Sequence, residues 1–503
     1  MNRGGSLALA ILWATFVRTG FTQPADSEHW YEYSIDGVGC GYLHRVHSFG
    51  EDVVRTQTEE QLRIRRNGVS VQLRTSRRFE ETEGGVALKA SSTQVGDGAT
   101  RSTILRFVEG TILITTNRFE GESTQTVGSD PGGWLTPCAV RRLVRDRLSS
   151  GSDWIEYQRL RLSGTPGTLQ QIRMERLLDP PRTSTQSGAD ISCWRVHREG
   201  ESLELLEWRD DQGLLLESEL DTGLGPIRCR LVERKQAISA ADEPGPELMR
   251  STLLEVRMMP SASDRIVTAG YHVRFKGPSD RLEALPLVAG AQRVRRLGQQ
   301  VFEFEIDASR GSPATPDELV DPVYRTPSLA LDSADPAIIE FTSRALESAP
   351  EGTLDRAERL RTSVDRHLQH KSLSSALASA SEVVRSRSGD CTEHAMLLAA
   401  AFRAAGIPSR VAIGLVHTEL GGGEPPAFVW HMWTQGLIGD QWYDFDSTRR
   451  HRFDGGHLLM GLDALSNDAA GPNMATLLGL VGRLRVEVVM IDGVALETSK
   501  ESS

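Results

Sequence analysis

The chain has 503 residues, too many for one ordinary hydrophobic core, so two or three domains are expected. Its apolar content of 39% and charged content of 25% are typical of a soluble globular protein. The formal net charge of −11 is modest for this length. Acidic and basic residues are interspersed, with no basic block or aromatic-interleaved stripe, which argues against a nucleic-acid partner.

The N-terminus has the pattern of a targeting segment. Arg3 precedes an apolar run over residues 7–17, whose length suits a signal peptide and is too short to span a bilayer. We therefore expect residues 1–23 to be a signal peptide or N-terminal anchor, and the protein to be exported to a periplasm, a cell envelope or the medium. A buried N-terminal helix is the alternative. No other segment predicts a membrane span.

Alternating polarity predicts a β-rich antiparallel region over residues 24–240. Three hairpins are predicted at turns over residues 67–68, 109–110 and 210–213. Helical periodicity is nearly absent, so a meander or open barrel is expected, in one or two lobes. Residues 237–247 have the composition of a linker, and a further β segment is predicted over residues 248–308.

The chain has five cysteines, and four of them fall in this β-rich region: Cys40, Cys138, Cys193 and Cys229. In an oxidising compartment these four could form two disulfides, with three possible connectivities. The alternative is that each is a single buried thiol, and the sequence does not separate the two. Cys391 stands alone in the C-terminal half, and a leftover thiol in an exported protein is a candidate reactive group.

Helical periodicity starts at Asp335–Pro336, an N-cap aspartate followed by a proline suited to the first helical position. Further helices are predicted from about Thr353, from about Ser375 and from Cys391, the last ending at Gly406. Three strands follow, over residues 410–416, 428–437 and 441–445. Helices packed on an antiparallel sheet give an α+β fold. This domain is expected over residues 327–470, followed by a C-terminal strand and polar tail over residues 471–503.

A thiol at the start of a helix is favoured as thiolate by the helix dipole and nearby backbone N–H groups. Cys391 has this position, directly after Gly389–Asp390. His431 is on the second predicted strand and Asp446 ends the third, so antiparallel pairing brings them together. We predict Cys391 as nucleophile, His431 as base and Asp446 as the acid that orients the ring. No cofactor or metal is expected.

Neighbouring polar residues offer alternatives. Asp390 and Asp444 could replace Asp446, which is preferred because it ends the strand. Asp390 is also expected, with Glu393, to be a first-turn charge that suits the helix dipole. His394 is expected to be a neighbour or a structural contact.

A metal centre is a less favoured alternative. Its zinc ligands would be Cys391, His394, His431 and Asp446. The remaining histidines of the C-terminal region are expected at the surface or in turns: His417, His451 and His457.

Taken in order, these motifs resemble the core of the transglutaminase-like superfamily, in its bacterial type with a β-rich N-terminal region. The motifs are Gly389-Asp390-Cys391-Thr392-Glu393-His394-Ala395, residues 403–410, His431-Met432-Trp433 and residues 442–448. The likeness covers about residues 335–465. It implies a papain-like thiol fold with Cys391 as nucleophile, His431 as the histidine and Asp446 as the acid. It also implies a cysteine protease, amidase or acyltransferase, whose substrate is a protein or peptide, with a cell-envelope substrate as one option.

The chain departs from animal transglutaminases. Ser447 stands where the family commonly has proline, and no tryptophan lies between Trp208 and Trp430 to match the one that aids their oxyanion. No acidic calcium loop is visible, so hydrolysis is favoured over cross-linking. The alternative from another class is a non-catalytic scaffold or binding module that retains the fold. The acyl donor and acceptor, the role of the β-rich region and the oligomeric state stay open.

Overall fold

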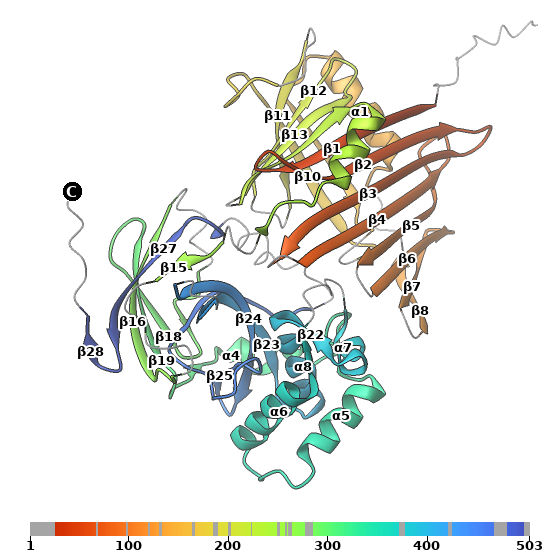
Figure 1. Cartoon of the computed structure of the whole chain (residues 1–503). Helices are drawn as coiled ribbons and strands as arrows, with labels where there is room; N and C mark the ends of the chain where they lie inside the picture. The colour runs from red at the N-terminus through yellow and green to blue at the C-terminus, as the bar shows by residue number, and fades with distance from the viewer. Residues whose placement is uncertain are drawn as a thin grey trace, which may run out of the picture.

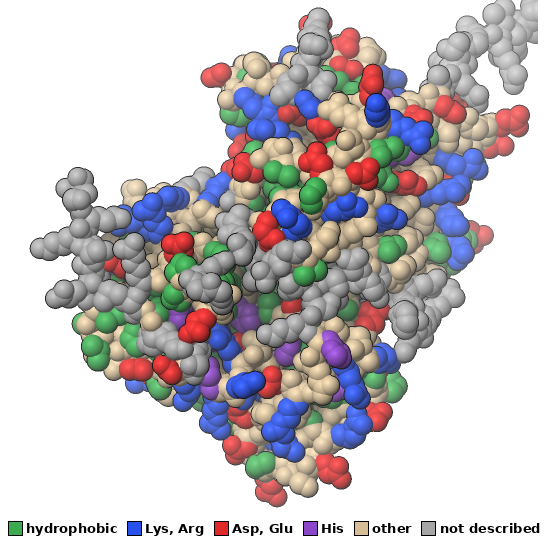
Figure 2. Space-filling model, viewed as in Figure 1, with side chains coloured by type: hydrophobic (Ala, Val, Ile, Leu, Met, Phe, Trp, Pro, Cys, Tyr) green, Lys and Arg blue, Asp and Glu red, His purple; other side chains and the backbone are tan. Residues whose placement is uncertain are grey.

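The computed structural model describes most of the chain, and its strands form three main sheets (Figure 1). The described residues are 26–66, 69–96, 99–118, 121–129, 133–162, 166–184, 190–199, 203–222, 224–248, 252–256, 259, 264–276, 285–371, 378–420, 425–466 and 480–496. The predicted signal peptide lies outside them. Among the described residues, no helix is both long and apolar enough to cross a membrane. Basic and acidic side chains are interspersed over the face shown in Figure 2.

A 14-stranded antiparallel sheet fills the N-terminal half, in the order β8-β7-β6-β5-β4-β3-β2-β1-β14-β13-β12-β11-β10-β9. Its strands are β1 (Ser27–Ile35), β2 (Val38–Phe49), β3 (Val54–Arg66), β4 (Val69–Glu81), β5 (Ala87–Gly96), β6 (Ala99–Val108), β7 (Thr111–Arg118), β8 (Gly121–Ser129), β9 (Trp154–Leu160), β10 (Leu169–Leu177), β11 (Ser192–Arg198), β12 (Leu205–Arg209), β13 (Leu215–Thr222) and β14 (Gly225–Val232). Two meanders therefore meet where β1 pairs with β14. The three predicted hairpins are confirmed as β3–β4, β6–β7 and β12–β13.

Two helices occur where the sequence predicted almost none. They are α1 (Pro137–Ser149) and α2 (Arg234–Asp242). The linker prediction is wrong for the residues that α2 occupies, because Ala237, Ala240 and Ala241 form a buried face on this helix, which packs on β1 and β2. Small side chains let a short helix lie close to a sheet. A buried face made of alanines gives only a weak amphipathic pattern, so the sequence does not indicate this helix clearly.

All five cysteines are free thiols, so the single-thiol alternative holds in this structure. Cys40, Cys138, Cys193 and Cys229 are buried. Burial raises the pKa of the Cys40 and Cys229 thiols to about 12 and that of Cys193 to about 11. Thiols of this kind are inert at neutral pH, because only the thiolate reacts. Cys391 differs from them in being partly exposed.

A smaller antiparallel sheet joins the middle of the chain to its C-terminal part. Its order is β17-β18-β19-β16-β27-β28. The strands are β16 (Thr268–Phe275), β17 (Val288–Ala289), β18 (Gln292–Arg296), β19 (Val301–Asp307), β27 (Leu484–Ile491) and β28 (Val494–Ala495). Strand β16 pairs with β27. The β segment predicted over residues 248–308 and the strand predicted within residues 471–503 therefore belong to one sheet.

The third sheet has the order β20-β25-β24-β23-β26, with β15 paired to β24. Its strands are β15 (Leu254–Glu255), β20 (Ser312–Pro313), β23 (Ser409–Thr418), β24 (Ala427–Ile438), β25 (Gln441–Phe445) and β26 (His457–Asp463). The helical elements around it are α4 (Pro316–Val320), the 3₁₀ turn η2 (Pro322–Tyr324), α5 (Pro336–Leu346), α6 (Thr353–His367), α7 (Ala380–Ser386) and α8 (Cys391–Ala404). The predicted α+β order is therefore present, and β21 (His370–Lys371) pairs with β22 (Ser388–Gly389) beside it.

Helix α8 packs directly on strands β23 and β24. The contact is close because Gly436 of β24 faces Phe402 of α8, where an added Cβ would lie 2.8 Å from the ring. The ring of Phe402 in turn meets Phe445 of β25 edge-on. One continuous hydrophobic cluster extends from this helix into the small sheet, so both sheets share a core. This packing sets the N-terminus of α8 against the strands that carry His431.

Candidate active site

The start of α8 is built by a capping box. Asp390 is the N-cap residue and accepts a hydrogen bond from the Thr392 N–H (2.8 Å), while the Glu393 carboxyl accepts one from the Asp390 N–H (2.8 Å). These bonds satisfy N–H groups that the first turn leaves without intrahelical partners. Cys391 is thus held at the first helical position, with its thiol partly exposed.

Glu393 differs from the expected charged first-turn residue. Its side chain is buried, and burial together with repulsion from Asp390 raises its pKa to about 8. The carboxyl is therefore mostly protonated at neutral pH. The expectation of a charge at Glu393 is wrong, because the sequence does not reveal that this turn is covered by the rest of the core.

His431 lies between an acid and a thiol. Strands β24 and β25 are antiparallel neighbours, and their pairing places His431 Nε2 2.9 Å from Asp446 Oδ2. The Cys391 thiol is also close enough to the His431 ring to affect its pKa. Burial alone would lower the pKa of His431, but attraction to Asp446, the hydrogen bond to Asp446 and the nearby Cys391 thiol raise it to about 10. The ring is therefore an imidazolium at neutral pH.

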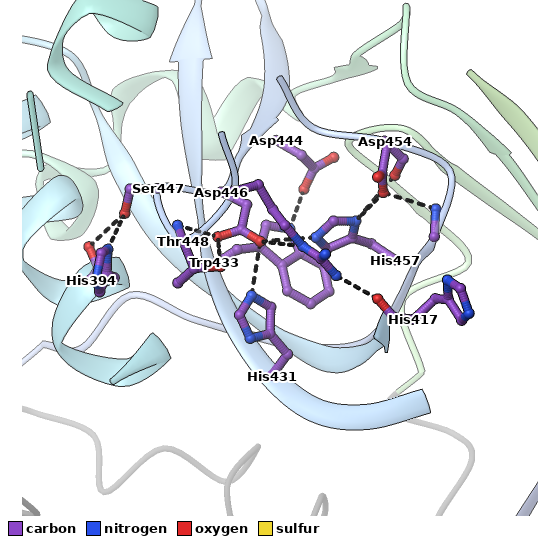
Figure 3. A network of polar contacts seen from close by, with 12 residues as sticks. His394, His417, His431, Trp433, Asp444, Asp446, Ser447, Thr448, Asp454 and His457 are labelled. Carbon is purple, nitrogen blue, oxygen red and sulfur yellow. Dashed lines mark hydrogen bonds and ion pairs between the residues drawn. The ribbon is translucent and has the colours of Figure 1, made fainter. Parts of the chain in front are cut away.

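The carboxylate of Asp446 accepts hydrogen bonds on both oxygens (Figure 3). Oδ1 accepts from the Thr448 N–H (2.8 Å) and from the Thr448 hydroxyl (2.7 Å). Oδ2 faces His431 and also His457, whose Nε2 is 3.1 Å away. Burial acts to raise the pKa of Asp446, yet these two histidines hold it well below its usual range. Asp446 is thus a fixed anion at neutral pH.

His457 is buried beside Asp446, so its expected place at the surface or in a turn is wrong. The residue is only 1% exposed and opens β26, which pairs with β23. Its Nδ1 lies 2.9 Å from Asp454 Oδ1. The signal available in the sequence is the apolar run that follows, residues 458–460, since a polar residue at the head of a buried strand is itself buried.

His417 is buried as well, contrary to expectation, and its Nε2 has no hydrogen-bond partner among the described residues. His451 is partly exposed and lies 3.6 Å from Asp454. Among the described residues, neither histidine forms a hydrogen bond or a ring contact with Cys391 or His431, and we assign neither a role.

The alternative acids and His394 take other positions. Asp390 caps α8, and Asp444 accepts hydrogen bonds from the Trp433 indole and the Ala291 N–H, each 2.8 Å. Asp444 therefore joins the third sheet to the small sheet. His394 is buried, and its Nδ1 lies 3.3 Å from the Ser447 hydroxyl. The serine that departs from the family pattern thus serves as a partner for His394.

A buried arginine, not among the predicted site residues, supports the chain after β25. Arg361 of α6 donates to the carbonyl oxygens of Asp446 (3.3 Å) and Arg449 (2.8 Å), and pairs with Glu358 (2.8 Å). A guanidinium has five donors in a rigid fork, which suits this multiple contact. No periodicity in the sequence marks such a role, because Arg361 lies among many charged residues of an amphipathic helix.

One group of residues has the composition of a metal site. Ligand atoms of His431, Asp446 and His457 lie within 4.8 Å of one another. This set differs from the zinc alternative derived from the sequence, because His457 and not His394 lies beside Asp446. The second nitrogen of His457 faces a carboxylate, as in many metal sites. The same distances are those of hydrogen bonds, which account for each of these atoms with protons alone.

Residues 340–447 match the family model described as Transglutaminase-like superfamily. A search of curated proteins found no match. A β-barrel-like protein of a domain of unknown function from Brucella abortus is 10% identical, with 41% of this chain and 95% of that chain covered and a TM-score of 0.31.

Two further solved structures are similar over about the same length. One, from Cytophaga hutchinsonii and provisionally classed as a cysteine protease, is 15% identical, covers 46% of this chain and 88% of that chain, and has a TM-score of 0.27. The other is the periplasmic domain of TgpA from Pseudomonas aeruginosa bound to ethylmercury, at 15% identity, 37% and 90% coverage and a TM-score of 0.23.

Proposed function

Residues 340–447 of this chain belong to the Transglutaminase-like superfamily, and on that premise we propose that the protein is an exported thiol enzyme. It acts on amide bonds of a protein or peptide, by hydrolysis or acyl transfer, through Cys391, His431 and Asp446. The observation that carries the proposal is the position of His431, whose ring nitrogen lies 2.9 Å from the Asp446 carboxylate and whose pKa is also raised by the nearby Cys391 thiol. This is the arrangement that nucleophilic thiol catalysis requires.

The proposed reaction has two steps. The Cys391 thiolate attacks the amide carbonyl carbon, and a tetrahedral oxyanion forms. When it collapses, the C–N bond breaks, His431 gives its proton to the departing amine, and a thioester remains on Cys391. In the second step neutral His431 removes a proton from water or an acceptor amine, which attacks the thioester and releases the thiolate. Asp446 keeps the ring oriented and stabilises its charged form throughout.

Export is the second part of the proposal. It rests on the apolar run over residues 7–17 after Arg3, which lies outside the described residues. Free buried cysteines suit either a reducing or an oxidising compartment, so the thiols do not decide the matter. Fusion of residues 1–23 to a reporter that folds only after export, followed by cell fractionation, would test it. A reporter that stays in the cytosol would contradict export.

The test of the chemistry uses alkylation of Cys391, because it needs no substrate. An imidazolium beside a thiol stabilises the thiolate, so iodoacetamide should label Cys391 in the wild-type protein faster than it labels a free thiol. Cys391→Ala should lose this labelling and all hydrolysis of protein substrates while keeping its fold by circular dichroism.

The rival function is a non-catalytic scaffold or binding module. It predicts that Cys391 labels no faster than a free thiol across the pH range, a result that would contradict the enzyme. A metal centre predicts instead stoichiometric zinc in the purified protein and loss of activity with a chelator. Mass spectrometry of a covalently trapped Cys391 from a native extract would identify the acyl group.

A further inference from the structure

His457 lies beside Asp446 and has no role in the proposed reaction. Its two ring nitrogens face carboxylates on opposite sides: Nε2 faces Asp446 Oδ2 at 3.1 Å and Nδ1 faces Asp454 Oδ1 at 2.9 Å. Figure 3 shows the ring between the two acids, and the dashed lines from His457 and His431 meet at the same oxygen of Asp446, Oδ2. The backbone carbonyl of Asp454 is a second acceptor for Nδ1, at 3.1 Å.

This geometry determines the protonation state of His457. Ionised carboxylates only accept hydrogen bonds, and a neutral imidazole has only one N–H to give. Both nitrogens can be satisfied only if the ring carries two protons and is an imidazolium. Burial acts to lower the pKa of His457, but Asp446 and Asp454 raise it overall, in agreement with the hydrogen-bond pattern. Asp446 and Asp454 both have a lowered pKa.

The result is a chain of alternating charges through a buried part of the protein. It runs from Asp454 (negative) to His457 (positive), Asp446 (negative) and His431 (positive), and ends at the Cys391 thiol. His457 is 1% exposed and Asp446 is 1% exposed, so solvent screens these charges little. Each of these buried charges lies beside at least one partner of opposite sign, which lowers the cost of burying it.

Other groups that surround His457 complete its environment. Phe453 lies against the ring with centroids 4.3 Å apart, and Trp433 of β24 meets it edge-on at 5.3 Å. The remaining charged groups are more distant. Arg449 Nε is 3.9 Å from Asp446 Oδ2, and His451 is 3.6 Å from Asp454. The ring therefore has little freedom to rotate away from its two acids.

The loop that carries Asp454 is held by the small sheet. The Tyr271 hydroxyl of β16 donates to the Gly455 carbonyl (2.7 Å), and the Gly455 N–H donates to the Ile266 carbonyl (2.7 Å). Space at this contact is tight, because a Cβ on Gly455 would lie 3.0 Å from Ile266 and 3.2 Å from Ala269. A sheet outside the family-matched segment thus supports the loop behind Asp446.

We propose that His457, fixed between Asp454 and Asp446, is a positioning residue that holds the Asp446 carboxylate in the orientation His431 requires, and that the contact between Tyr271 and Gly455 braces this unit. The proposal rests on the proposed function for its role in catalysis. It assigns to the small sheet a specific task, the support of the acid in the catalytic triad. His457 itself touches neither Cys391 nor the substrate carbonyl and acts only through Asp446.

The test compares His457→Phe, which keeps a ring of similar size but donates no hydrogen bond, with His457→Gln, which keeps a donor for Asp446. Two readouts are used. One is the pH profile of Cys391 alkylation by iodoacetamide. The other is the downfield proton resonance of the His431 Nε2–H, measured in a Cys391→Ala background so that it does not depend on the thiol. Circular dichroism and thermal melting check that each variant is folded.

We expect His457→Phe to broaden or lose the His431 resonance and to slow alkylation at pH 6 by about tenfold, the equivalent of about 1.4 kcal/mol. His457→Gln should recover the resonance and part of the rate. A resonance and a profile identical to wild type in His457→Phe would overturn the proposal. If wild-type Cys391 behaves as a free thiol, the proposed function fails, while the resonance still decides whether His457 positions Asp446.

A second variant, Tyr271→Phe, gives a test that does not depend on the folding of His457→Phe. Tyr271→Phe removes one hydroxyl outside the site and leaves every charge of the chain in place. It should broaden the same resonance and slow alkylation in the same direction, by less than His457→Phe does. A folded Tyr271→Phe protein with an unchanged resonance would overturn the bracing role of the small sheet.

Discussion

The backbone of Gly389 lies directly against the side chain of Glu393. A Cβ built on Gly389 would come within 2.3 Å of the Glu393 Cβ and 2.8 Å of its Cγ, far closer than two carbon atoms can approach. The glycine before Cys391 therefore leaves room for the capping-box glutamate, which in turn holds the first turn of α8. Two residues that are four apart in the sequence together position the thiol.

Gly389→Ala should destabilise the protein and disturb Cys391. Relief of the clash must move the Glu393 backbone or break the capping box, at a cost of about 1–3 kcal/mol as for other overpacked sites. Chemical denaturation would measure the loss in free energy of unfolding. Gly298→Ala is the control, because its Cβ would meet only Val301 at 4.0 Å. Equal stability changes in the two variants would contradict this account.

Glu393→Gln should change how stability depends on pH. The folded pKa of Glu393 is raised to about 8 from an ordinary value of 4.5. The protonated carboxyl therefore contributes to the free energy of unfolding fully below pH 4.5, and this contribution is lost as the pH rises to 8. Glutamine stays neutral at every pH. The difference in free energy of unfolding between the two proteins should therefore change by at most about 1.4 kcal/mol per pH unit over this range. Measured at a series of pH values, the free energy of unfolding of the variant should rise relative to that of the wild type from pH 5 to 8. A pH-independent difference would contradict the raised pKa.

Asp446→Asn should weaken both stability and thiol reactivity. The folded pKa of His431 is raised to about 10, so the stability from its ion pair is fully present below pH 6.5 and is lost as the pH rises through 10. The variant should therefore be less stable by about 3 kcal/mol near pH 6, the usual effect of breaking a buried pair, and the gap should narrow toward pH 10.

The same variant should lower the rate of any thiol-dependent amide hydrolysis by about 10²–10⁴-fold, the usual contribution of acid–base catalysis, because the ring loses its orienting anion. Asp444→Asn is the matched control, since Asp444 bonds Trp433 and Ala291 and not His431. It should affect stability more than reactivity. Equal loss of Cys391 alkylation in both variants would contradict the distinction between the two acids.

The thiols should fall into two classes. Under denaturing, non-reducing conditions all five cysteines should react with a thiol reagent, because each is a free thiol in the structure. In the native protein we expect one fast-reacting thiol, Cys391, since burial raises the pKa of the others, as for Cys40 and Cys229 at about 12. Reductant should leave the melting temperature unchanged. A shift on reduction, or fewer than five reactive thiols, would show a disulfide.

Local features of the sequence predicted the elements that surround the site. Caps and periodicity place α5 at Asp335–Pro336 and α8 at Cys391, and a two-residue turn places β24 beside β25. These features depend on residues that are close in the chain, so they can be recognised without knowledge of the fold. The same reasoning failed for α2, whose buried face consists of alanines that carry little hydropathy signal.

By itself, the sequence determined the order of helices and strands in the C-terminal part and the three residues proposed for catalysis, because caps, turns and motif spacing are local. Only the tertiary structure decided that β1 pairs with β14, that β16 pairs with β27, and that His457 and Arg361 support Asp446. Those contacts join distant segments. The partner of a buried polar side chain is chosen by the packing of the whole core, which no short stretch of sequence specifies.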